Sequence, residues 1–140
     1  NVPKSQKYAD KTLNNKREYK YFTVAYKMSG GKKVYLGRTN TVHVAMPYAA
    51  KTNVLKVTVN KTKANLAKGK TFKITKKVKL ENPKKKALNH LTKKERFITS
   101  NAKVATVSSA GVIKAVRKGT CTVYVMSENG VCAKIKVTVK

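Results

Sequence analysis

Apolar and polar residues alternate along most of the chain, and this alternation predicts β-strands. In the last segment, Ile135, Val137 and Val139 alternate with Lys134 and Lys136. A period of two places these apolar side chains on one face of a strand and the lysines on the other. No segment keeps a helical period, and many short strands separated by turn residues are typical of a β-sandwich or barrel. We therefore predict an all-β chain whose lysines lie largely on solvent-facing strand positions.

Pro47 interrupts the series of strands, because proline cannot donate a hydrogen bond within a central ladder. Before it, strands are predicted at Tyr19–Tyr26, Val34–Leu36 and Thr39–Met46, preceded by a shorter extended segment from Lys7 to Leu13. After it, a new alternating strand is predicted to place Leu55, Val57 and Val59 on its inward face. The predicted organisation is a first unit at residues 1–47, a linker at 48–53 and a second unit at 54–140.

The two cysteines lie on either side of a turn near the C-terminus. Asn129-Gly130 is a dipeptide typical of a two-residue hairpin turn. That turn would place Cys132 opposite Ser127, beside the outward-facing lysines, and Cys121 near the far end of the ladder. Two cysteines in 140 residues form no disulfide framework. We therefore predict that both are free thiols.

The second unit carries several motifs in a recognisable order. They are Val57-Thr58-Val59-Asn60, Leu66-Ala67-Lys68-Gly69-Lys70-Thr71, Ser100-Asn101-Ala102-Lys103-Val104-Ala105-Thr106-Val107-Ser108, Gly111-Val112-Ile113-Lys114-Ala115 and Lys118-Gly119-Thr120-Cys121-Thr122-Val123. This order closely resembles family 2 of the bacterial Ig-like domains, which occur in bacterial surface proteins and intimin- or invasin-like adhesins. Two departures from the family pattern are an expanded loop at 81–94 and Phe97, where the family often has Trp or another aromatic residue. The resemblance implies an Ig-like antiparallel β-sandwich over residues 54–140.

The first 47 residues resemble the last three strands of a fibronectin type III domain. The resemblance rests on Tyr8-Ala9-Asp10-Lys11-Thr12-Leu13, on the aromatic-rich strand Tyr19–Tyr26 and on the strand that precedes Pro47. It implies a partial fibronectin type III-like β-sandwich, without the half that usually precedes these strands. Half a sandwich would leave an apolar face and an open strand edge. The chain is then either a piece of a longer protein or completes itself by strand exchange, which would give a strand-exchanged dimer.

Both resemblances imply repeated extracellular modules. In tandem and rich in lysine, they resemble the C-terminal ends of large surface or secreted proteins of anaerobic Gram-positive bacteria. The implied location is extracellular, on the cell surface or secreted. The chain opens on no signal peptide and closes on no wall-anchoring motif, so we expect an internal or C-terminal piece of a larger parent protein.

Positive charge is the most unusual property of the composition. Lys and Arg total 33 against 5 acidic residues, which gives a net charge of +28. Twelve of the 29 residues from 68 to 96 are cationic. A field of lysines favours anionic polymers in general, whereas sequence-reading nucleic-acid binders rely on Arg. The candidate anion-binding residues are Lys76, Lys77, Lys79, Lys84, Lys85, Lys86, Lys93 and Lys94. The alternative is that the charge is only a solvated surface.

Catalytic and metal-binding groups are scarce in this sequence. The only acids are Asp10, Glu18, Glu81, Glu95 and Glu128, and they are dispersed among cations. His43 and His90 have no acid or cysteine nearby in the sequence, so we expect both at a surface or strand edge, and Asp10 in a turn or edge role. General acid–base chemistry, a zinc site and a calcium site all need clusters that this pattern does not predict. No stretch approaches the length of a membrane span.

The sequence therefore predicts a non-enzyme without cofactors. The leading hypothesis is a structural or adhesion module that acts as a spacer or presenter and contacts neighbouring domains of a larger parent protein. The alternative is a binding module for acidic polymers, such as teichoic acid, mucin or sulfated glycans, through the Lys-rich loop. Nucleic acid is a disfavoured partner, because neither a recognition helix nor an Arg set is predicted.

Overall fold

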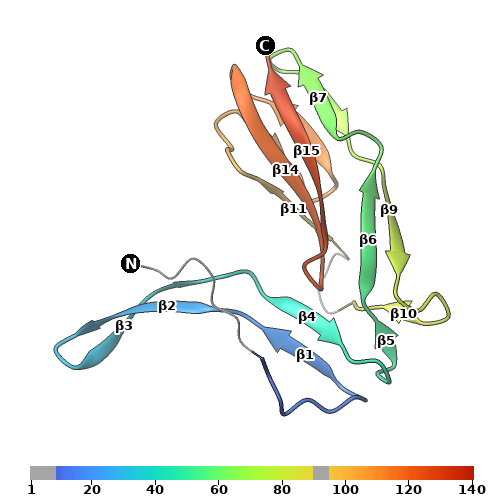
Figure 1. The fold of residues 1–140 in the computed structure, drawn as a ribbon. Coiled ribbons are helices and arrows are strands. Elements are labelled where there is room, and N and C mark those ends of the chain that lie inside the picture. The colour runs from blue at the N-terminus through green and yellow to red at the C-terminus, as the bar shows by residue number, and fades with distance from the viewer. Residues whose placement is uncertain (1–8, 90–94) are drawn as a thin grey trace.

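The computed structural model of the chain describes residues 9–89 and 95–140, and every regular element in these residues is a β-strand. Figure 1 shows two parts: a long two-stranded ribbon near the N-terminus and a layered sandwich made by the rest of the chain. The predicted all-β class is confirmed. None of the described segments is a helix long and apolar enough to cross a membrane.

The sandwich has two layers around one core. One layer is a four-stranded sheet in the order β11-β14-β15-β7, in which β7 runs parallel to β15 and the other pairs are antiparallel. The sheet β12-β13-β8 and the pair β6-β9 cover its inner face. The strands are β6 (Val54–Val59), β7 (Lys63–Leu66), β8 (Thr71–Lys73), β9 (Lys76–Leu80), β11 (Glu95–Thr99), β12 (Ala105–Val107), β13 (Val112–Ala115), β14 (Gly119–Ser127) and β15 (Cys132–Val139).

The core is built from the alternating apolar positions of these strands. On β15, Ile135, Val137 and Val139 are buried, whereas Lys134 and Lys136 are exposed. Each fully buried aliphatic side chain contributes about 1.5–3 kcal/mol through the hydrophobic effect. The predicted orientation of this strand is confirmed, and its lysines cost nothing in desolvation.

The prediction for Leu55 is wrong, because β6 contains a bulge. Val54 pairs with Leu80 and Lys56 pairs with Lys79, so Leu55 has no partner in the ladder. An extra residue shifts the alternation of side chains by one position. Leu55 is 52% exposed, and Val54 packs against the core in its place.

The hairpin between β14 and β15 is one residue longer than predicted. Met126, rather than Ser127, pairs with Cys132, and Ser127 donates its N–H to the carbonyl of Val131 (2.9 Å). The loop therefore has three residues, and its last residue, Gly130, takes a φ of 86°. That backbone conformation suits glycine and closes a three-residue hairpin loop. Both cysteines are free, as predicted, with Cys121 buried and Cys132 half-buried.

The ribbon is one long hairpin with a break in its middle. Its outer half pairs β2 with β3 around the Gly30-Gly31 turn, and its inner half pairs β1 with β4. At the break, Thr39 donates its N–H to the carbonyl of Thr23, and Thr23 donates its N–H to Oγ1 of Thr39 (both 2.9 Å). The strands are β1 (Glu18–Tyr21), β2 (Val24–Ser29), β3 (Lys32–Arg38) and β4 (Val42–Ala45).

The extended strand predicted from Lys7 to Leu13 is not formed by residues 9–13, which are irregular; Lys7 and Tyr8 lie outside the described residues. Instead, the Asp10 carboxylate accepts hydrogen bonds from the N–H (3.0 Å) and Oγ1 (2.7 Å) of Thr12. A third comes from the hydroxyl of Tyr21 (3.2 Å). The Thr12 backbone and hydroxyl bonds, followed by the Tyr21 bond, lower the pKa of Asp10. The local turn competes with strand pairing, which explains the difference.

The predicted linker and the Lys-rich loop each supply one short strand. β5 (Lys51–Thr52) and β10 (Lys86–Ala87) pair in parallel, with Lys86 beside Lys51. Both strands lie where the ribbon meets the sandwich (Figure 1). This small ladder is therefore part of the junction between the two parts.

Candidate functional site

Asn53 ties the inner end of the ribbon to the sandwich. Its Oδ1 accepts a hydrogen bond from the N–H of Ala45 (2.7 Å), and its Nδ2 donates to the carbonyl of Ala45 (2.8 Å). The same Nδ2 also donates to Oε2 of Glu81 (2.9 Å). The side-chain amide thus substitutes for a neighbouring strand at Ala45. Because Asn53 and Ala45 are both buried, these bonds hold the two parts in a defined arrangement.

Lys85 forms a second tie across the junction. Its Nζ donates to the carbonyl oxygens of Pro47 (2.9 Å) and Ala49 (2.7 Å). At the same junction, Leu88 packs with Ala45 and Ala49 in a small buried cluster of its own. The ammonium of Lys85 has therefore committed two of its three N–H donors to the protein. Lys85, which was predicted to bind anions, therefore has one N–H donor left for a ligand.

His43 and Glu128 meet at the same junction. The N–H of His43 donates to the carbonyl of Glu128 (2.9 Å), and Nδ1 of His43 lies 3.8 Å from Oε2 of Glu128. The side chains are only 13% and 2% exposed. No acidic residue is near His43 in the sequence, and the fold brings Glu128 to it from a distant part of the chain. His90 lies outside the described residues.

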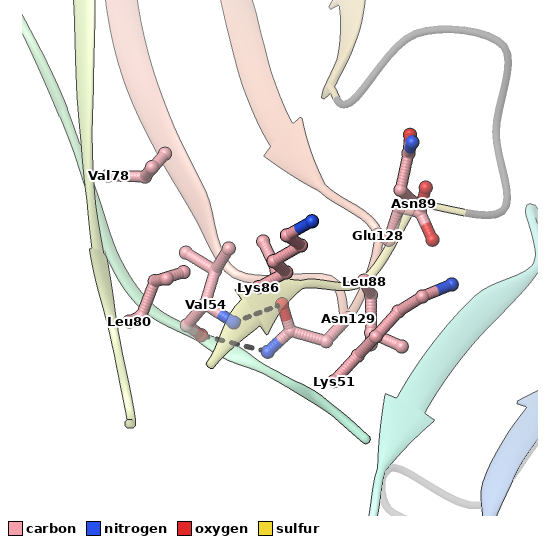
Figure 2. A pocket seen from close by; sticks show the side chains of 10 residues that line it. Lys51, Val54, Val78, Leu80, Lys86, Leu88, Asn89, Glu128 and Asn129 are labelled. Atoms are coloured by element: carbon pink, nitrogen blue, oxygen red, sulfur yellow. Dashed lines mark hydrogen bonds between the residues drawn. The ribbon is translucent and has the colours of Figure 1, made fainter. Parts of the chain in front are cut away.

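A cleft of about 510 Å³ lies beside the β5–β10 ladder. Figure 2 shows its lining side chains, with Asn129 bonded to the backbone of Val54. Oδ1 of Asn129 accepts from the N–H of Val54 (3.2 Å), and Nδ2 of Asn129 donates to the carbonyl of Val54 (2.9 Å). These bonds fix one wall of the cleft. The lining residues are Lys51, Val54, Val78, Leu80, Lys86, Ala87, Leu88, Asn89, Glu128 and Asn129.

The candidate lysines of β9 fall into two kinds. Lys77 and Lys79 are exposed and alternate with Val78, which lines the cleft. Lys76 is half-buried, and its Nζ lies 5.9 Å from the centre of the Phe97 ring, in a cation–π contact. Lys77 and Lys79 therefore lie on the face of β9 that points away from the cleft.

The candidate lysines of the loop also separate. Lys84 is exposed, Lys85 is bound at the junction and Lys86 lines the cleft. Lys93 and Lys94 lie outside the described residues. Sequence reasoning missed Lys51, since no local pattern shows that it pairs with the loop. The structure thus brings one predicted lysine, Lys86, into a cleft with a second that was not predicted.

No constellation for catalysis or metal binding was found among the side chains that the structure describes. Within those residues, no group of three or more His, Cys, Asp or Glu side chains could hold a metal ion. Glu81 is bound to Asn53 and Asp10 to Thr12. The arrangement offers structural contacts and a basic cleft.

The fold is an Ig-like β-sandwich that carries an N-terminal ribbon. Residues 53–139 match the family described as bacterial Ig-like domain (group 2), and the chain belongs to this family. The match includes the cleft wall at Val54 and the β14–β15 hairpin. It does not include the ribbon.

Solved structures of similar fold come from surface-layer proteins. The crystal structure of the S-layer protein rSbsC(31-844) aligns with a TM-score of 0.51 and 21% identity, over 72% of this chain and 14% of that one. The structure of SbsC domains 4 and 5 aligns with a TM-score of 0.50 and 21% identity, over 71% of this chain and 58% of that one. At this identity the likeness concerns the fold alone. The chain thus spans a small part of the whole S-layer protein. No curated protein sequence matches.

Proposed function

We propose that this chain is a non-catalytic structural module of a larger bacterial surface or secreted protein, in which it spaces or presents neighbouring domains. Membership in a bacterial Ig-like family and the likeness to S-layer domains support a structural role at the cell surface. The observation that carries the proposal is the junction. There the ribbon is held to the sandwich by Asn53 and Lys85, while the outer face of the ribbon stays uncovered.

The uncovered face carries a row of exposed aromatic and aliphatic side chains, and two cations lie over its rings: Lys33 over Tyr26 (4.7 Å) and Arg38 over Phe22 (5.2 Å). Directly paired residues of two strands share a face, so Tyr35 lies beside Tyr26 and extends the row of alternating side chains on β2. The five apolar side chains on or beside this face are between 42% and 62% exposed: Phe22, Val24, Tyr26, Met28 and Tyr35. Such a patch marks a contact surface in a folded protein. We propose that a neighbouring domain of the parent protein covers it.

The fibronectin type III-like character of residues 1–47 belongs to the same proposal. On this hypothesis the ribbon is one part of a second sandwich whose remaining strands pack on the aromatic face. A strand-exchanged dimer would cover the same face with a second copy. Light scattering of the 140-residue protein separates the two partners, since only the second copy makes a dimer without any other chain.

Small-angle scattering tests the spacer role. The intact chain should scatter as an elongated particle of defined shape, because the junction bonds fix the ribbon relative to the sandwich. The double variant Asn53→Ala/Lys85→Gln should broaden the distribution of interatomic distances, whereas Lys84→Gln, an exposed neighbour, should not. A compact globule in the unmodified protein would refute the proposal.

A further inference from the structure

We propose that the cleft beside the β5–β10 ladder binds an organic anion with an apolar body, whose carboxylate or phosphate group lies between Lys51 and Lys86. This inference goes beyond the structural role and does not depend on it. It rests on three observations: two like charges placed side by side, an apolar wall left open to solvent, and a rigid base.

The two lysines are direct neighbours on adjacent strands of the β5–β10 ladder. Lys86 pairs with Lys51 in the parallel β5–β10 register, and both residues line the same cleft. The structure gives neither ammonium a hydrogen-bond or ion-pair partner among the residues it describes. Like charges on directly paired residues destabilise a sheet, and an anion bound between them would remove that cost.

One acidic residue, Glu128, also lines the cleft. Glu128 is 2% exposed, and its Oε2 lies 3.8 Å from Nδ1 of His43, on the ribbon side of the junction. Its burial limits the contact of its carboxylate with a ligand in the open part of the cleft. The exposed charge at the mouth of the cleft is therefore positive.

The wall of the cleft that β6 and β9 form is apolar. Val78 is 43% exposed although it points toward the cleft, and Val54 and Leu80 are only half-buried. A bare inorganic anion would leave these side chains in water, whereas an acyl or similar apolar body would cover them. About 510 Å³ is within the range of small-molecule sites, which are concave, mostly apolar and carry a few polar groups.

The base of the cleft is held in place before any ligand arrives. Asn129 makes two hydrogen bonds to the backbone of Val54, and Leu88 is buried beside the junction. The neighbouring Lys85 is fixed by two carbonyls, which sets the course of the loop through Lys86. A preformed site loses less free energy to ordering when it binds.

Titration of the intact 140-residue protein with four probes tests the assignment. Octanoate and octyl phosphate carry both an anion and an apolar chain, inorganic phosphate carries only the anion, and octyl glucoside carries only the apolar chain with a neutral head. Amide chemical shifts report the site. Octanoate and octyl phosphate should both shift the amides of Val78 and Lys86, and their relative affinities tell whether the cleft prefers carboxylate or phosphate. Inorganic phosphate and octyl glucoside should bind at least about tenfold more weakly, since each lacks one of the two interactions.

Single substitutions complete the test. Lys51→Gln and Lys86→Gln should each weaken binding of the preferred probe about tenfold, as expected for loss of one charged hydrogen bond. Lys79→Gln removes the same charge from the outward face of β9 and should leave the affinity unchanged. Far-UV circular dichroism checks that each variant is folded.

Two outcomes would overturn the proposal. If inorganic phosphate binds as tightly as octyl phosphate, or if Lys79→Gln weakens binding as much as Lys86→Gln does, the interaction is general electrostatic attraction to a cationic surface. If no probe shifts the amides of Val78 and Lys86, the cleft is not an anion site.

Discussion

Asn53 is the residue on which the arrangement of the two parts depends most. Its amide satisfies both backbone groups of Ala45, which is buried at the end of β4. Truncation leaves a buried donor and a buried acceptor to find other partners, and each such loss is costly. The amide of Asn53 makes the two hydrogen bonds to Ala45 that the backbone of a neighbouring strand would otherwise make.

Asn53→Ala should therefore destabilise the protein by about 2–4 kcal/mol, measured by denaturant unfolding. Asn60→Ala is the control; it removes two side-chain hydrogen bonds, whereas Asn53→Ala removes three, the third being that to Glu81. Asn60 also accepts from a backbone N–H, that of Thr75 (3.1 Å), and donates to a backbone carbonyl, that of Lys73 (3.2 Å), but at an exposed position. The control should cost about 1 kcal/mol or less, because water can replace the lost bonds. Equal losses would mean that burial at Asn53 is unimportant.

Gly111 has two separate reasons to be glycine. Its φ is 76°, and a Cβ at this position would lie 2.9 Å from ring atoms of Phe97. Gly69 shares the first reason, with a φ of 81°, but a Cβ there would meet nothing within 4 Å. The two glycines therefore separate backbone strain from steric contact.

Gly69→Ala should destabilise the protein by about 1–2 kcal/mol through backbone strain alone. Gly111→Ala should cost at least about 1 kcal/mol more, because the Phe97 ring must also move. Thermal or denaturant unfolding of both variants gives the difference directly. Indistinguishable losses would show that the ring at Phe97 moves aside freely.

At the scale of elements, the ribbon and the sandwich differ in how their strands are supported. β14 has a hydrogen-bonded neighbour on both sides and buries every second side chain. Among the residues that the structure describes, β2 pairs only with β3, and all six residues of β2 are exposed. An isolated two-stranded hairpin has little stability of its own in water.

Amides of β2 and β3 should therefore exchange with solvent at least roughly 100-fold faster than those of β14 and β15. Hydrogen-exchange mass spectrometry or NMR measures this. β1 and β4 serve as the internal comparison, and they should fall between the two, since the junction supports their inner end. Equal protection of β2 and β14 would show that something covers the ribbon in solution.

The elements themselves could largely be predicted from the sequence, because alternation follows directly from the geometry of a strand. The spacing of Ile135, Val137 and Val139 alone was enough to predict that they share the buried face of a strand. The bulge at Leu55 and the three-residue loop before Val131 could not be predicted, since each depends on how two strands pair. A shift of one residue changes no composition and little local propensity.

The candidate site was less predictable, because its parts are distant in the sequence. Lys86 was recognised from the density of positive charge, but its partner Lys51 lies in a segment predicted to be a linker. The same distance hid the His43–Glu128 pair. Charge density located the region, and only the fold shows which lysine is bound to carbonyls and which lines the cleft.

At the scale of the whole molecule, a net charge of +28 lowers the stability of the folded state. Most strand lysines point outward, so the charges avoid desolvation but repel one another. Self-repulsion of this kind destabilises the compact state and weakens as salt shortens the screening length. The unfolded chain is more expanded and suffers less of it.

The melting temperature should therefore rise by several degrees between about 10 and 150 mM sodium chloride, over which the screening length falls from about 30 to about 8 Å. Differential scanning calorimetry measures the shift. Potassium chloride at the same ionic strength should give the same result, because screening depends on charge and not on the identity of the cation. A melting temperature that falls with salt would mean that attractive ion pairs dominate instead.

The parallel pairing of β7 with β15 has a mechanical consequence. Four residues of each strand are in register, from Lys63 beside Lys136 to Leu66 beside Val139. If tension is applied to the chain before β7 and after β15, it pulls two parallel strands in opposite directions along their length. The hydrogen bonds between them then share the load and must fail together, whereas a hairpin pulled at its open end would lose them one at a time. The β7–β15 pair is thus well placed to resist stretching of the chain.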